Sequence, residues 1–262
     1  MSEAAVKIAI RGLSKSFGAN HVLTEIDLDI RDGESLVIIG ASGTGKSVLL
    51  KNIVGILTPD SGSIKIAGEE VVGVTGNSRD RINRKLGMLF QGAALFDSLT
   101  LWENAAFGLI SAQRMGRDEA RVKAIDFLKQ VGLSEADANR YPSDISAGAQ
   151  KRVGLARAIA TEPEILFFDE PTTGIDPVMG DVIDSLIVSC VRNLGATALT
   201  ITHDMESARR IGDRVAMIYE GKIVWVGDVA EIDDSGNAFI DQFIHGSVEG
   251  PMASLIAANA SV

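Results

Sequence analysis

The chain of 262 residues is poor in several features that define other classes of protein. It has one cysteine, Cys190, which excludes an internal disulfide and indicates a reducing compartment. Its 25 basic side chains are outnumbered by 35 acidic ones, so we expect no nucleic-acid partner. It has no apolar run of about 18 residues, the length that crosses a bilayer, and residues 1–5 lack a basic signal region. We therefore expect a soluble polypeptide whose 46% apolar content builds one large domain.

Residues 40–47, GASGTGKS, fit the phosphate-binding loop G-x-x-x-x-G-K-[ST] at every fixed position. An apolar strand is predicted before the loop, at 36–39, and an apolar helix after it, at about 46–57. In that order backbone N–H groups and a helix N-terminus converge on one anion, the lysine reaches the outer phosphates and the serine hydroxyl reaches magnesium. The sequence therefore predicts a nucleoside triphosphate site, and its expected contacts are Gly40, Ser42, Gly43, Thr44, Gly45, Lys46 and Ser47.

The spacing of apolar residues divides the rest of the chain into strand-rich parts and a helical part. Up to about residue 90, alternation with period two indicates short antiparallel strands on a core. From about 101 to 130 apolar residues recur at helical spacing, which indicates a separate helical arm. Beyond the arm, apolar strands at 165–168 and 197–202 alternate with helices, as in a mainly parallel sheet, and 215–226 is typical of a hairpin.

Four more segments follow the phosphate loop: LFQ at 89–91, ISAGAQ at 145–150, ILFFDE at 165–170 and ITHD at 201–204. With the loop, this order resembles the ATP-binding subunit of ABC transporters over residues 6–230. The resemblance implies an α/β fold with a P-loop NTPase core, a mainly parallel sheet, an antiparallel β-subdomain and an inserted α-helical subdomain. It also implies an ATPase domain over 1–246, with the helical subdomain at about 92–155, and a C-terminal tail at 247–262.

The segment ILFFDE contains the residues expected to hydrolyse ATP. Its apolar residues predict a buried strand that delivers Asp169 beside the loop, where a carboxylate can hold the magnesium shell. Glu170 follows at the strand tip, positioned to orient and polarise the attacking water. By the resemblance, His203 contacts the terminal phosphate and orders Glu170, and Gln91 touches metal and water. The implied catalytic residues are Lys46, Gln91, Glu170 and His203, and the implied Mg²⁺ ligands are Ser47, Gln91 and Asp169.

The segment ISAGAQ departs from the family's usual LSGGQ. Ser146 and Gly148 remain, and the residues that follow predict a helix whose N-terminus can face an anion. Ala147 replaces a glycine, which is harmless only if its φ is negative or a methyl group has room. In the family this end of the helix completes the phosphate loop of a second, antiparallel copy, with Asp176 at the dimer seam. Phe17 stands where the family stacks an aromatic ring on adenine, although a core phenylalanine is a fair alternative.

Two segments, 92–104 and 239–251, resemble the ATPase of Mla-type phospholipid transporters. This resemblance implies a peripheral position on the cytoplasmic side of a bacterial inner membrane. The implied partners are a second copy of the chain, an integral permease, an MCE-domain lipid-binding protein and a small regulatory subunit, and we expect the tail to reach a neighbouring subunit. Two alternatives stay open: the ATPase of a nutrient importer, for example for amino acids, and an ATP-triggered assembly module with little turnover. A soluble small-molecule kinase would not predict the ISAGAQ helix and the histidine in this order.

Overall fold

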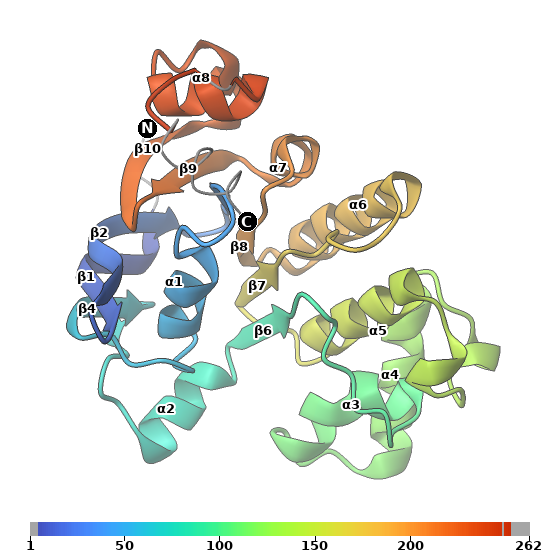
Figure 1. The fold of residues 1–262 in the computed structure, drawn as a ribbon. Coiled ribbons are helices and arrows are strands. Elements are labelled where there is room, and N and C mark those ends of the chain that lie inside the picture. Colours follow the sequence, from blue (N-terminus) through green and yellow to red (C-terminus); the bar gives the residue numbers. More distant parts are fainter. Residues whose placement is uncertain (1–4, 248, 253–262) are drawn as a thin grey trace.

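The computed structural model describes residues 5–247 and 249–252, and its centre is a six-stranded sheet (Figure 1). The strand order is β10-β9-β3-β8-β7-β6. The parallel strands are β3 (Ser35–Ile39), β6 (Leu86–Leu89), β7 (Ile165–Asp169), β8 (Thr197–Ile201) and β9 (Arg214–Tyr219). Only the edge strand β10 (Lys222–Asp228) is antiparallel, in the expected hairpin with β9. The predicted mainly parallel sheet is therefore confirmed.

The central strands are apolar throughout because both of their faces are covered. Every residue of β3 and of β7 is buried. Along β3, Leu36 and Ile38 belong to one hydrophobic core, and Val37 and Ile39 belong to the other. The sheet therefore separates two cores that are built by different parts of the chain.

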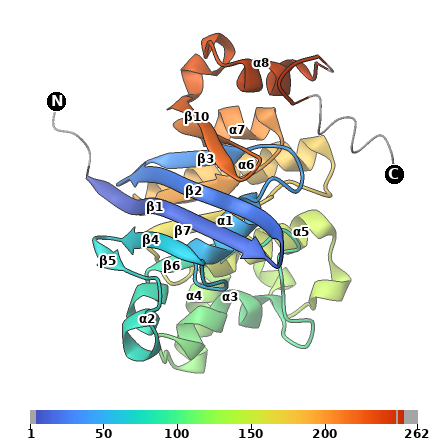
Figure 2. The ribbon, with the colours of Figure 1, turned by 60° about the vertical axis from the view of Figure 1, so that its left-hand side comes forward.

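The first core lies between the central sheet and a four-stranded antiparallel sheet, which Figure 2 shows in blue and cyan. The order of this second sheet is β2-β1-β4-β5. Its strands are β1 (Val6–Phe17), β2 (Asn20–Arg31), β4 (Ser61–Ile66) and β5 (Glu69–Glu70), with α1 (Lys46–Ile53) packed in the same core. The antiparallel part is confirmed, but β1 and β2 have 12 residues each and are not short.

Two expectations for this part of the chain were wrong. Helix α1 ends at Ile53 and not near residue 57, because Gly55 adopts a left-handed φ of 78° that cannot continue a helix. A helix that was not expected, α2 (Gly76–Asn83), interrupts the strands. It buries only Ile82, so its sequence lacks the apolar periodicity by which helices are recognised.

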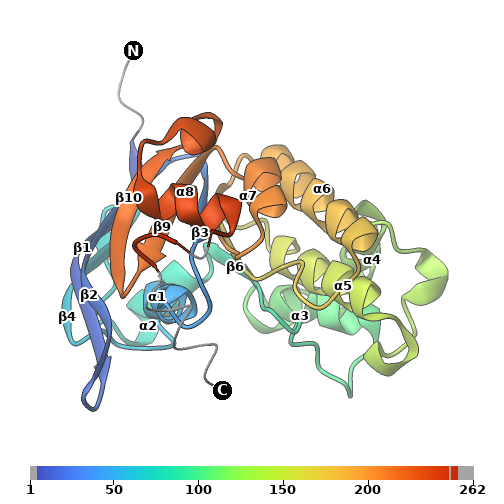
Figure 3. The same cartoon turned by 45° about the horizontal axis from the view of Figure 1, so that its top comes forward.

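The second core is covered by helices, as Figures 1 and 3 show. The expected helical arm is present as α3 (Leu101–Ser111), α4 (Arg117–Gln130), two short turns at Glu135–Asp137 and Pro142–Asp144, and α5 (Ala147–Ile159). Helix α5 also packs on β6 and continues beyond residue 155, the end given to the subdomain from the sequence. The remaining elements are α6 (Pro177–Leu194), α7 (Met205–Ile211), a turn at Val229–Asp234 and α8 (Ala238–His245).

Most of the predicted tail at 247–262 lies outside the described residues. Its described part folds back on α8, where the N–H of Met252 donates to Oε1 of Gln242 at 2.7 Å. Over the described part of the chain, no helix combines the length and apolarity that a membrane span requires.

The sheet also determines where functional side chains gather. The carboxyl ends of β3, β6, β7 and β8 lie at one edge, because these strands are parallel. The chain segments that leave this edge begin at Gly40, Phe90, Glu170 and Thr202. Ligands of open α/β sheets bind at such an edge.

Candidate active site

The loop between β3 and α1 has a backbone that only glycine permits at two points. Gly40 has a φ of 151°, and a Cβ there would lie 2.4 Å from the carbonyl oxygen of Ile218. Gly45 has a φ of 104°, and a Cβ there would lie 2.9 Å from the carbonyl oxygen of Val22. The N-cap of α1 is Gly45, which has no side chain to cap the helix, so the first N–H groups remain available to a ligand. The loop therefore fits the anion cradle that the sequence predicts.

Lys46 and Ser47 open α1 and face the end of β7. The ammonium of Lys46 is buried and donates to the carbonyl oxygens of Gly40 and Ala41 at 2.6 and 2.9 Å. Burial lowers the pKa of Lys46, and the negative charges of Glu170 and Asp169 partly offset this shift. The hydroxyl of Ser47 donates to Oδ1 of Asp169 at 3.2 Å.

The pair of Ser47 and Asp169 is suited to magnesium. Burial raises the pKa of Asp169, while the hydrogen bond from Ser47 opposes this shift. Among the residues that the structure describes, no cluster of three or more His, Cys, Asp or Glu side chains could hold a metal ion. Mg²⁺ in phosphate sites needs only one or two protein oxygens, because substrate phosphates and water complete its shell. The neighbouring hydroxyl and carboxylate meet that requirement.

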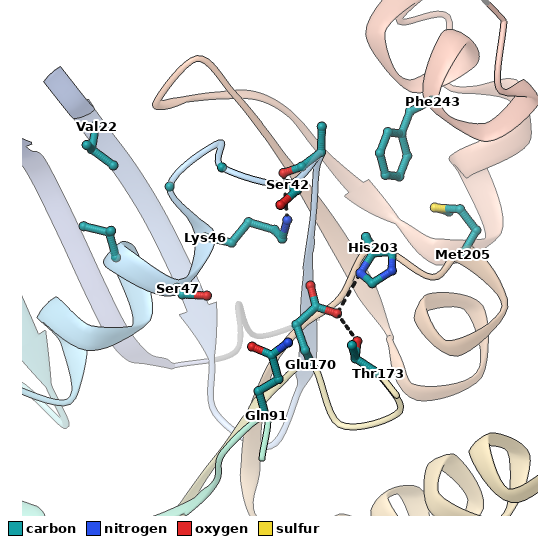
Figure 4. Close-up of a pocket in the computed structure, with 14 residues that line it drawn as sticks. Val22, Ser42, Lys46, Ser47, Gln91, Glu170, Thr173, His203, Met205 and Phe243 are labelled. Carbon is teal, nitrogen blue, oxygen red and sulfur yellow. Dashed lines mark hydrogen bonds and ion pairs between the residues drawn. The ribbon is translucent and has the colours of Figure 1, made fainter. Parts of the chain in front are cut away.

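A cavity of about 720 Å³ opens beside the loop and has the size of a ligand site (Figure 4). In Figure 4, Ser47, Gln91 and Glu170 point into the same space. The sequence-predicted residues that line the cavity are Ser42, Gly43, Gly45, Lys46, Ser47, Gln91, Glu170 and His203. The parallel edge thus brings together side chains that are more than 150 residues apart in the sequence.

Glu170 is held from two sides at the tip of β7. Its Oε2 lies 2.8 Å from Nδ1 of His203 and accepts a hydrogen bond from the hydroxyl of Thr173 at 2.9 Å. Glu170 is almost fully buried and has a left-handed φ of 49°, a conformation that is uncommon outside glycine. Such backbone strain is frequent in functional sites. The arrangement fixes a carboxylate beside the phosphate loop.

The other predicted residues do not line this cavity. Gly40 and Thr44 shape the loop from within, and Thr44 donates its hydroxyl to the carbonyl of Ala41 at 2.9 Å. Phe17 ends β1 and is 48% exposed, with the ammonium of Lys15 located 5.5 Å from the centre of its ring. Phe17 is thus not a core residue.

The ISAGAQ segment forms the start of α5, away from the chain's own phosphate loop. Ser146 caps α5 by accepting the N–H of Ala149 at 3.3 Å. Ala147 is exposed and is not among the residues with positive φ, so the condition for a harmless alanine is met. A Cβ on Gly148 would lie 2.6 Å from Cγ of Met179, which places this segment beside the start of α6, where Asp176 is the cap.

Sequence reasoning gave no individual role to several residues near the site. Thr173 was quoted only as part of a motif, and Val22, Met205 and Phe243 line the cavity without a local signal. Lys151 donates to the carbonyl oxygens of Gln91 and Glu170. The sequence signal that could have pointed to Lys151 is its position directly after the ISAGAQ segment.

Comparisons with known proteins agree with this geometry. The family model described as "ABC transporter" matches residues 23–173. The chain is 39% identical over 267 residues to protein TRIGALACTOSYLDIACYLGLYCEROL 3, chloroplastic, of Arabidopsis thaliana, covering 96% of this chain and 77% of that protein. It is 37% identical over 247 residues to the probable ribonucleotide transport ATP-binding protein mkl of Mycobacterium leprae, covering 94% and 71%.

Solved structures with a similar fold are ATP-binding cassettes as well. One is the dimeric, post-hydrolysis state of the ATP-binding cassette MJ0796 bound to ADP and Pi. It aligns with a TM-score of 0.78 and 31% identity, over 85% of this chain and 98% of that one. The loop, the carboxylates and the histidine thus occur in a chain whose sequence and fold match ATP-binding cassettes along most of its length. The chain therefore belongs to the ABC transporter family as an ATP-binding and ATP-hydrolysing subunit.

Proposed function

We propose that this ATPase powers lipid transport through a separate membrane permease, from the cytoplasmic side of a bacterial inner membrane. The observation that supports an energy-coupling role is the convergence of Lys46, Ser47, Gln91, Glu170 and His203 on one cavity. These side chains have the roles that triphosphate hydrolysis requires: a phosphate clamp, a metal shell and an oriented base.

In this proposal the side chains divide phosphate binding, metal binding and proton transfer among themselves. Lys46 and the loop N–H groups neutralise the phosphates. Ser47, Asp169 and Gln91 would hold Mg²⁺, which would supply positive charge beside the outer phosphates. Glu170 accepts a proton from the attacking water. His203 holds the carboxylate of Glu170 in place through Nδ1 and contacts the terminal phosphate.

The site is completed by a second copy of the chain. Ser146 and Gly148 lie outside the cavity formed by their own chain, at a helix N-terminus that can bind an anion. We infer that they meet the nucleotide held by a partner, so that ATP joins two chains and hydrolysis releases them. In the same dimer Asp176 lies at the seam between the two chains. Phe17 stacks on the adenine ring of the nucleotide.

A second cavity, of about 260 Å³, gives the permease a place to dock. It lies between β6, α3 and α5 and includes the side chains of Phe90 and Phe107, the latter 41% exposed. Phe90 lines this cavity and directly precedes Gln91, which lines the active-site cavity. A segment of a permease seated here would sense the position of Gln91.

The cargo is inferred from sequence. The segments 92–104 and 239–251 resemble those of Mla-type phospholipid transporters, and the Arabidopsis relative carries the name of a galactolipid. An MCE-domain protein and a small regulatory subunit are the further partners of that assembly. The second candidate is an importer of a small polar solute, which the ribonucleotide name of the mycobacterial relative favours.

Two measurements test the proposal. Phosphate release by the purified chain should be lost in Glu170→Gln, while this variant should form an ATP-dependent dimer. Mass spectrometry of the membrane complex, purified with its permease, should identify phospholipid as the bound molecule. A bound amino acid, or a ribonucleotide other than the ATP and ADP of the ATPase itself, and no lipid would favour the importer instead. Equal phosphate release by both forms would refute the catalytic assignment.

A further inference from the structure

Lys151 is a buried cation of α5 to which the mechanism above gives no task. It is 5% exposed, and it makes no salt bridge within residues 5–247 and 249–252. Its ammonium donates to the backbone carbonyl of Gln91 and, at 3.2 Å, to that of Glu170. Burial lowers its pKa, and the charges of Glu170 and Asp169 partly offset this shift. A buried ammonium is unfavourable unless its hydrogen bonds are made, and here two catalytic positions supply them.

The backbone that α5 holds in this way is unusual. Glu170, Ala93 and Ala94 have left-handed φ values of 49°, 59° and 47°. The carbonyls of all three accept hydrogen bonds from cations of α5, because Arg157 donates to Ala93 and Ala94 at 2.6 Å each. Residues in this conformation persist only where their surroundings hold them. Two side chains of one helix thus stabilise two strained places in the backbone. One is the segment that follows Gln91, and the other is Glu170 itself.

The same helix carries Ser146 and Gly148 at its start. Helix α5 has 13 residues and is mostly buried, so its first turn and Lys151 move together. A contact made by Ser146 is therefore mechanically connected to the carbonyls of Gln91 and Glu170, with no flexible segment between them.

We propose that Lys151 is a positioning residue that fixes the backbone of Gln91 and Glu170. Through this contact it links the orientation of both residues to the position of the ISAGAQ end of α5. The linking part rests on the proposed dimer, in which Ser146 contacts a partner's nucleotide. When α5 is drawn toward that nucleotide, Lys151 brings the carboxylate of its own chain into the geometry for hydrolysis. Binding of ATP does not need Lys151, because the phosphate loop is formed by β3 and α1.

The experiment compares Lys151→Met with Lys129→Met in the full chain. Methionine is unbranched and only one atom shorter than lysine, and it removes both donated hydrogen bonds. Lys129 is the matched control, since it lies in the same helical arm and, among the described residues, its ammonium donates only to the exposed carboxylate of Glu135. Phosphate release is measured over a range of ATP concentrations, together with the urea midpoint of unfolding.

In Lys151→Met we expect kcat to fall between about tenfold and a hundredfold, the effect of a small displacement of a catalytic group, with KM for ATP changed less than about threefold. Lys151→Gln keeps one amide donor and should give an intermediate kcat. Lys129→Met should stay within about twofold of the wild type. A kcat of Lys151→Met within twofold of wild type would overturn the proposal. So would a parallel loss of ATP binding and unfolding midpoint in both Lys151 variants, which indicates a purely structural residue.

A second arm separates this proposal from the dimer on which its linking part rests. ATP-dependent dimerisation is measured for Glu170→Gln and for the double variant Glu170→Gln with Lys151→Met. We expect both to dimerise, with dissociation constants within about threefold, because the loop and Ser146 are unchanged. If neither dimerises, the proposed dimer is wrong, and a lowered kcat in Lys151→Met still tests the positioning role. If only the double variant fails, Lys151 acts on assembly and its positioning role is wrong.

Discussion

The Nδ1 atom of His203 lies 2.8 Å from Oε2 of Glu170, and the hydroxyl of Thr173 donates to the same oxygen at 2.9 Å. Two partners on one oxygen fix the plane of the carboxylate. The other oxygen, Oε1, is then the one that faces the cavity with Lys46 and Gln91 (Figure 4). If Glu170 is the base, as proposed, a carboxylate held in this way does not have to be reoriented when water attacks the phosphate.

Removing the imidazole should release this carboxylate. We expect His203→Ala to lower kcat for ATP hydrolysis by about a hundredfold, the lower end of the effect of a positioned acid or base, and to change KM less than about threefold. Phosphate release and equilibrium ATP binding measure the two quantities. His245→Ala is the control, because His245 lies on α8, pairs with Asp241 of its own helix and does not line the cavity. A loss of ATP affinity equal to the loss of kcat would contradict a role confined to hydrolysis.

Substitution should impair the protein at Gly148 and leave it nearly unchanged at Ala147. A Cβ on Gly148 meets Cγ of Met179 at 2.6 Å, so Gly148→Ala must displace the start of α6 or its methionine. We expect a severalfold lower kcat and weaker ATP-dependent dimerisation for this variant, with unchanged ATP binding by the monomer. The double variant Gly148→Ala with Met179→Ala should recover, since the contact is relieved. Ala147→Gly should stay within about twofold, because its side chain is exposed and its φ is not positive.

Phe17 should contribute to binding and not to hydrolysis. Its ring is 48% exposed at the end of β1, beside the ammonium of Lys15 and near the β2 residue Val22, which lines the cavity. Stacking of a base on an aromatic ring is worth about 1–3 kcal/mol, so Phe17→Ala should raise KM for ATP roughly tenfold without changing kcat. Phe96→Ala removes a ring of similar exposure that packs on Phe107 and does not line the cavity, and it is the control for the isolated chain. An unchanged KM in Phe17→Ala would assign the ring to another surface.

Much of the cavity could be predicted from sequence because its residues occupy the ends of apolar parallel strands. The apolar runs before Gly40 and Glu170 predict buried strands. Parallel strands of this kind bring their carboxyl ends together however far apart they are in the chain. Lys151 could not be predicted in this way. Its partners are backbone carbonyls, which every residue has, so no pairing of residue types marks the contact. The polar helix α2 escaped notice because it buries almost nothing, so no periodicity marks it.

A pH dependence should arise outside the cavity, at Asp184 of α6. This carboxyl is 2% exposed, accepts the hydroxyl of Ser207 at 2.7 Å through Oδ2, and has no hydrogen-bond partner for Oδ1 within the described part of the chain. Burial raises its pKa from 3.8 to about 6, against the opposing effects of Ser207 and of the charge of Arg210. The folded state therefore binds a proton more tightly than the unfolded state between these pH values, and the contribution of this group to stability falls as pH rises through the window.

The comparison of wild type with Asp184→Asn isolates this contribution, because asparagine can accept the Ser207 hydrogen bond but does not titrate. We expect the difference in unfolding free energy, wild type minus variant, to fall by about 1–3 kcal/mol as pH rises from about 4 to about 7, and to stay constant above that. Urea unfolding at several pH values measures it, with the exposed Asp126→Asn as the matched control. A difference that is flat across this range would show that Asp184 is charged in the folded protein even in mild acid. In that case the helices α6 and α7, which Asp184 and Ser207 join, would enclose an ionised carboxylate.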